Sequence, residues 1–73
     1  MPSIGQIVLF HFDNGHGLVS RPAIVTHVHD DGTANLAIII DRAEDTDAPQ
    51  AVRAGFFEKV IEHDEPHAGT WTA

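Results

Sequence analysis

The sequence predicts an all-β fold, a small SH3-like barrel of four to five antiparallel strands. Four or five short apolar stretches are separated by Gly-, Asp- and Asn-rich turn signals, a spacing typical of small barrels and curled sheets. Closing such a sheet removes exposed strand edges. A length of 73 residues allows one domain. We therefore predict a single domain over residues 1–73, in which 64–73 form a polar tail.

The first strand is predicted over Ile4–Phe12, followed by a turn over residues 13–17 whose Asn-Gly pair favours left-handed conformations. Alternation divides its residues between two faces, Ile4, Val8, Phe10 and Phe12 on one and Gly5, Ile7, Leu9 and His11 on the other. Both faces are largely apolar. We therefore expect both to be covered or paired.

A hairpin is predicted from Ala23–His29 and Thr33–Asp41. A two-residue loop at 31–32 would place Ile24 opposite Ile39. A three-residue loop over 30–32 pairs Val28 with Ala34, Thr26 with Leu36 and Ile24 with Ile38, and leaves His27, Asn35, His29 and Thr33 on the other face. The second register gathers the apolar residues on one face and puts Gly32 at a left-handed position, so we predict it.

The rest of the chain gives weaker signals. Residues 42–50 are acidic, and their apolar residues show no regular spacing, which predicts a solvated, mobile loop. Residues 56–61 contain two adjacent apolar pairs and fit either a helical turn or a strand. We predict a short turn followed by a strand over Val60–His63.

Net charge excludes several function classes. The chain carries −7, with Arg21, Arg42, Arg53 and Lys59 as its only cations. Nucleic-acid binding depends on clustered Lys and Arg, so we expect no nucleic-acid partner. The same shortage of cations and the lack of a long apolar run argue against membrane binding. The absence of cysteine fits a reducing compartment, and the N-terminus lacks the pattern of a signal peptide.

Six histidines raise the question of a metal site. His27 and His29 share one face of a predicted strand, and His11 is the candidate third ligand. Their spacing matches no zinc signature, and thiolates are missing. We therefore predict no metal and no other cofactor. No histidine and carboxylate converge with a nucleophile, and the chain is too short for a deep pocket. We predict that the protein is not an enzyme.

Four residues are candidates for a protein interface: Trp71, Arg21, Phe56 and Phe57. Trp71 stands alone in a polar tail, so it either folds back to cap the barrel or anchors the chain to a neighbour. Arg21 either forms a local ion pair or contributes to binding.

Several short motifs resemble one family. They are Met1-Pro2 with Ile4-Gly5 and Val8, then Arg21-Pro22-Ala23-Ile24-Val25, Asn35-Leu36, Asp41 and Gly69-Thr70-Trp71. This pattern resembles a family of short proteins, mostly without an assigned activity, that tailed bacteriophages and prophages encode. Family members usually continue beyond the tryptophan with another aromatic residue and an acidic end, whereas Thr72-Ala73 closes this sequence. Residues 56–61 also match the pattern poorly.

The resemblance, the small core and the acidity predict a virion accessory protein acting by protein–protein contact. It would decorate or cement the capsid, or belong to the neck or tail, with major capsid or neck and tail proteins as partners and a possible homo-oligomer. It would lie in the virion, and in the host cytoplasm during assembly. The alternative is a non-virion regulator that binds a basic host protein, with imitation of nucleic acid as one way of doing so.

Overall fold

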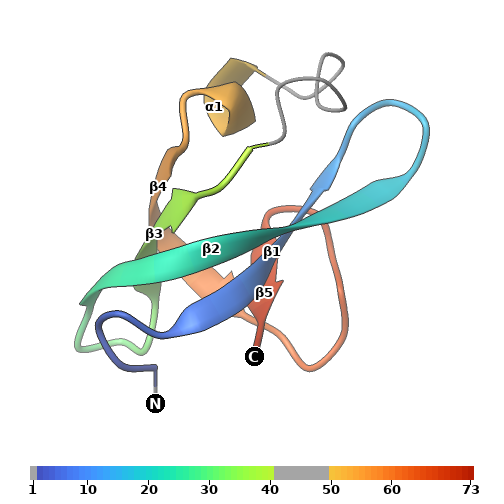
Figure 1. The fold of residues 1–73 in the computed structure, drawn as a ribbon. Helices are drawn as coiled ribbons and strands as arrows, with labels where there is room; N and C mark the ends of the chain where they lie inside the picture. Colours follow the sequence, from blue (N-terminus) through green and yellow to red (C-terminus); the bar gives the residue numbers. More distant parts are fainter. Residues whose placement is uncertain (1, 41–49) are drawn as a thin grey trace.

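The chain folds into a closed five-stranded barrel, seen in Figure 1, a computed structural model that describes residues 2–40 and 50–73. The elements in chain order are β1 (Ile7–Asp13), β2 (Leu18–Val28), β3 (Ala34–Ile38), α1 (Gln50–Arg53), β4 (Phe56–Glu62) and β5 (Thr70–Thr72). Strand order follows the sequence, and β5 returns to pair with β1. The predicted all-β barrel is confirmed. Its pairs are antiparallel apart from β4 and β5, which run parallel.

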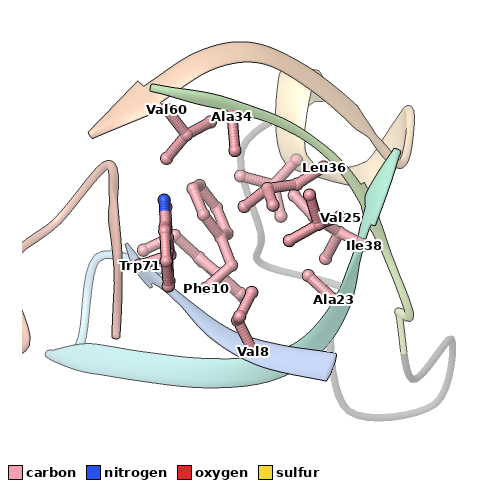
Figure 2. Packing of buried hydrophobic residues seen from close by; sticks show 11 residues of the cluster. Val8, Phe10, Ala23, Val25, Ala34, Leu36, Ile38, Val60 and Trp71 are labelled. Carbon is pink, nitrogen blue, oxygen red and sulfur yellow. The ribbon is translucent and has the colours of Figure 1, made fainter. Parts of the chain in front are cut away.

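The barrel interior is filled by side chains from every strand. Val8, Phe10 and Phe12 share one face of β1, as predicted, and all three are buried, whereas Ile4 lies before the strand and is exposed. Figure 2 shows the Trp71 ring beside Phe10 within this cluster. Among the described residues, the buried hydrophobic cluster consists of Val8, Phe10, Phe12, Ala23, Val25, Ala34, Leu36, Ile38, Val52, Val60 and Trp71.

Strand β2 begins at Leu18, five residues before the predicted start at Ala23. Pro22 does not block the strand, because the N–H and C=O of one residue in an antiparallel strand point to the same side. The Pro22 carbonyl faces β3, where it accepts from Ile39 N at 2.9 Å. The Pro22 nitrogen, which has no hydrogen to donate, therefore faces the end of β3 and not β1. The ladder between β1 and β2 continues unbroken from Ile24 to Leu18.

The hairpin between β2 and β3 begins as predicted and then departs from the predicted register. Val28 pairs with Ala34, and Gly32 has a φ of 87°. A bulge between Val25 and His27 then shifts the ladder. The observed partners after the bulge are Val25 with Leu36, Ile24 with Ala37 and Ala23 with Ile38. The predicted pairs Thr26–Leu36 and Ile24–Ile38 are therefore wrong, because the extra residue reverses which side chains face inward. Ile24 points outward.

Strand β4 covers residues 56–62, so the predicted turn before Val60 is wrong, and the strand ends at Glu62 instead of the predicted His63. A second bulge lies opposite β3, and Lys59 within it has a φ of 52°. Asn35 holds this bulge, because its Oδ1 accepts from Lys59 N at 3.0 Å and from His29 Nε2 at 2.7 Å. Strand β3 ends at Ile38, short of the predicted Asp41. The loop predicted over 42–50 lies outside the described residues except for Gln50, which begins α1.

The predicted polar tail returns to the barrel. Thr70–Thr72 form β5 between β1 and β4, and His63 N donates to Trp71 O at 2.9 Å. Trp71 is 1 % exposed. Of the two roles considered for it, the folded-back cap is the one that the structure shows.

Candidate protein interface

The outer face of β1 is apolar although it is not part of the core. Alternation that buries Val8 and Phe10 turns Ile7 and Leu9 outward, and both are exposed. The sequence led us to expect cover on both faces of this strand. In the single chain, the outer side remains open to solvent.

Strand pairing extends this apolar surface across four strands. Ile7 lies directly opposite Ile24, Ile24 opposite Ala37, and Ala37 opposite Phe56, which makes one row from β1 to β4. Side chains at directly opposed positions on one face are neighbours.

A second row lies beside the first. Leu9 is opposite Pro22 of β2, and Pro22 O accepts from Ile39 N just beyond β3. We call the two rows together the apolar outer face, which comprises Ile7, Leu9, Pro22, Ile24, Ala37, Ile39 and Phe56.

The apolar outer face is a band that curves around the closed barrel, because it spans four of the five strands. Ile7, Leu9, Ile24, Ile39 and Phe56 are 61, 43, 36, 52 and 73 % exposed. These fractions amount to about 500 Å² if a fully exposed large side chain presents roughly 200 Å². The largest apolar patch on a typical monomer measures about 300–600 Å² and often marks a binding site. No residue of the face carries a charge, which is typical of the centre of a protein interface.

His11 marks one end of the face. It follows Leu9 on the outer side of β1, yet it is buried. Its Nδ1 lies 2.7 Å from Ser20 Oγ on β2 and its Nε2 lies 2.9 Å from Thr72 Oγ1 on β5. Burial lowers the pKa of His11. The ring therefore joins three strands where the barrel closes.

Only one of the four predicted interface residues belongs to the apolar outer face. Phe56 is its most exposed member, whereas Phe57 turns inward and stacks on Phe10 with ring centroids 4.9 Å apart. Trp71 is in the core. Arg21 lies opposite Phe10 and is half-buried, and its Nη1 donates to Ser20 O at 3.1 Å. Phe57, Trp71 and Arg21 do not lie together on one surface. Their interface roles remain predictions.

The candidate metal ligands do not converge. The His27 and His29 rings lie 4.8 Å apart, and His29 Nε2 bonds Asn35. His11 pairs with Ser20, and His27 lies seven residues further along β2, about 20 Å away at the rise of a strand. Both ring nitrogens of His11 already have partners. Residues 2–40 and 50–73 contain no group of three or more His, Cys, Asp or Glu side chains suited to a metal ion.

Negative charge gathers on β4 and the loop after it. Glu58, Glu62, Asp64 and Glu65 are all exposed, and Lys59 is the only cation between residues 56 and 67. The described part of the chain holds no helix whose length and apolarity would suit a membrane span.

No protein-family model, no curated protein and no solved structure matches this chain. Support for a function therefore comes from the sequence and from the surface described above.

Proposed function

We propose that this protein works by binding other proteins through its apolar outer face, as an accessory component of a tailed-phage particle. It decorates or cements the capsid, or it belongs to the neck or tail. The observation that carries the proposal is the uncharged surface that continues over β1, β2, β3 and β4. A small acidic domain exposes such a surface at a cost in solubility, which a binding role explains.

The energetics suit docking on an assembly. Burial of the whole band, about 500 Å² at roughly 25 cal/mol per Å², sets an upper limit of about 12 kcal/mol. Association costs about 4–15 kcal/mol, so the net affinity of one such contact is modest. A particle that presents many copies of its partner raises the occupied fraction, and docking in turn stabilises the small barrel by mass action.

The resemblance to short proteins of tailed phages supports the phage setting. It rests on Arg21-Pro22-Ala23-Ile24-Val25, Gly69-Thr70-Trp71 and the N-terminal motif. Pro22 and Ile24 of the first motif belong to the apolar outer face, whereas Trp71 of the second holds the core. The partners in this setting are major capsid or neck and tail proteins, met in the host cytoplasm during assembly.

Mass spectrometry of purified particles tests the proposal. Particles from cells that express the chain are banded by density, treated with protease-free nuclease and washed at high salt. We expect peptides of this protein at a constant ratio to the major capsid protein across fractions. Its absence from intact particles, with the protein present in the lysate, would remove the virion role.

A second candidate is a regulator that binds a basic host protein. Glu58, Glu62, Asp64 and Glu65, with one lysine among them, favour it. Contacts of this kind weaken as salt rises, because exposed charges are screened over about 10 Å at 0.1 M ionic strength. Capture of a DNA-binding protein from host lysate at low salt, and its release by salt, would favour this candidate over the first.

A further inference from the structure

We propose that Asn14 is a site of self-modification, at which attack by the Gly15 backbone nitrogen converts the side-chain amide to a carboxylate. The site lies in the turn between β1 and β2, which projects from the barrel in Figure 1. It is independent of the proposed function, because the reaction needs no partner. Three features of the turn support it: the glycine after Asn14, the placement of the attacking nitrogen, and a donor on the amide oxygen.

The glycine after Asn14 leaves the attacking nitrogen unhindered. Gly15 has a φ of 91°, a left-handed conformation that glycine adopts at little cost and that other residues rarely adopt. Apart from its chain neighbours, no heavy atom lies within 4 Å of the position that a Cβ would take there. Residues 13 and 15–17 are exposed and Asn14 is half-buried. The turn therefore has room for ring closure and access for water.

Two side-chain hydrogen bonds place the reacting atoms. Asn14 Oδ1 accepts from His16 N at 2.9 Å, a bond that closes a turn in which the side chain imitates the backbone. Such a turn folds Cγ of Asn14 back toward the peptide nitrogen of Gly15. Asp13 Oδ1 accepts from this same nitrogen at 2.7 Å. Because asparagine is among the thermally labile residues, a geometry that brings Cγ and the nitrogen together favours reaction.

Both hydrogen bonds also serve the chemistry. As Gly15 N forms a bond to Asn14 Cγ, negative charge develops on Oδ1, where His16 N stands at the distance of an oxyanion donor. The proton of Gly15 N points at the Asp13 carboxylate, which is placed to accept it.

The bond changes convert the amide and one water into a carboxylic acid and ammonia. The bond between Asn14 Cγ and Nδ2 breaks, Nδ2 takes up the proton that Gly15 N has lost, and ammonia leaves. The product is a succinimide ring that contains Gly15 N. Water then opens this ring at either of its two carbonyls, which gives aspartate or isoaspartate at position 14.

The products change the turn in charge and in length. Each adds one negative charge to the −7 of the chain. Isoaspartate also routes the main chain through the side-chain methylene, which lengthens the connection between Asp13 and Leu18, the last pair of the ladder between β1 and β2. Since the only co-reactant is water, the modified fraction depends on the age of each chain.

Asn35, the other asparagine of the sequence, is a control within the same chain. Its Oδ1 accepts from His29 Nε2 and from Lys59 N, which fixes the side-chain amide. The residue after it, Leu36, is buried and is paired with β4. Neither the amide nor the following nitrogen can move toward the other in the folded barrel. We therefore expect Asn35 to stay intact while Asn14 reacts.

Ageing the purified full chain at neutral pH and warm temperature tests the inference. Cleavage before aspartate puts Asn14 in peptide 13–29 and Asn35 in peptide 31–40, and mass spectrometry follows the replacement of NH by O in each. An aspartate product adds a cleavage point at position 14, whereas isoaspartate does not, so the two are counted separately. We expect the modified fraction to rise for Asn14 alone. A parallel sample in guanidinium chloride should react no faster at Asn14 than the folded chain does.

Gly15→Ala should slow the reaction of Asn14 at least about tenfold, because a Cβ crowds the attacking nitrogen and disfavours the observed φ. Gly17→Ala is the matched control, since Gly17 lies in the same turn with a φ of 140° and equally open space but does not supply the nitrogen. Circular dichroism verifies that both variants are folded.

Two results would overturn the inference. One is an Asn14 that stays intact in the folded chain while it reacts in guanidinium chloride, because the turn would then protect the amide. The other is equal slowing by Gly15→Ala and Gly17→Ala. Particle binding does not enter these measurements, so a chain that is modified at Asn14 yet absent from particles would remove the proposed function and leave this inference in place.

Discussion

Replacing Trp71 with phenylalanine separates the two effects of this residue on stability. The indole is 1 % exposed, and its Nε1 is buried with no hydrogen-bond partner among the described residues. An unpartnered buried N–H costs about 1–3 kcal/mol, and phenylalanine removes it. The smaller ring leaves a partial cavity whose cost is of similar size, about 1–3 kcal/mol. We therefore expect Trp71→Phe to change the free energy of unfolding by less than about 1 kcal/mol.

Trp71→Ala is the comparison, because it leaves the whole cavity and should cost about 3–5 kcal/mol. At about 0.05–0.15 kcal/mol per residue, the entire fold is stable by only about 4–11 kcal/mol. The alanine variant should therefore be close to unfolding at room temperature. Urea titration followed by far-UV circular dichroism measures both variants, since Trp71 is the only tryptophan and the chain has no tyrosine. A loss above about 2 kcal/mol in Trp71→Phe would refute the reasoning, because it would mean that the indole N–H is bonded in solution.

Three further substitutions test single features of the barrel. Gly32→Ala should lower stability by about 1–2 kcal/mol in thermal unfolding, because φ is 87° and a Cβ there has open space, so that strain alone acts. An unchanged melting temperature would contradict this. Asn35→Ala should cost about 1–3 kcal/mol and speed hydrogen exchange at Lys59 N, which loses its acceptor together with His29. Unaltered exchange would show that the amide does not hold the bulge. His11→Gln tests pH dependence. Burial lowers the pKa of His11, so the unfolded chain binds more protons below about pH 6.5, and wild-type stability should be full above that pH and decline as pH falls towards the lowered value. Uptake of one proton can change the free energy of unfolding by at most about 1.4 kcal/mol per pH unit. If this free energy changes equally with pH in the wild type and in His11→Gln between about pH 5 and 6.5, His11 makes no such contribution.

Local rules predicted the parts of the fold that depend on nearby residues. The grouping of Val8, Phe10 and Phe12 on one face of β1 follows from alternation, whereas the expected cover over Ile7 and Leu9 is not seen in the single chain. The hairpin loop follows from Gly32, the residue that adopts a left-handed φ most cheaply. These features need no knowledge of the distant chain.

The register of β2 with β3 could not be predicted because a bulge interrupts that ladder. Ala23 and Ile24 are both apolar, so β2 has an apolar face whichever set of alternate residues points inward. Nothing in its sequence marks the bulge before His27. In β4 a signal was present. The adjacent pairs Phe56-Phe57 and Val60-Ile61 break alternation, and the structure explains this with inward Phe57 and Val60 on either side of a bulge.

The candidate site was only partly visible in the sequence for the same reason. Phe56 was predicted as an interface residue, and it belongs to the apolar outer face. Ile24 was assigned to the core, and the bulge turned it outward. Trp71 was weighed as an anchor, but β5 carries it into the barrel through pairing with a strand some sixty positions earlier in the chain. Such long-range pairing has no local signal.

Hydroxyl-radical footprinting tests most directly whether protein covers the apolar outer face. Phe56 and Ile61 are 73 and 59 % exposed in the single chain, and cleavage at Arg53 and Lys59 places them in separate tryptic peptides. Oxidation is measured in the free chain and in purified particles. We predict that the ratio of Phe56 to Ile61 oxidation falls several-fold on assembly into particles. A ratio that stays constant between the free chain and the particles would contradict the account.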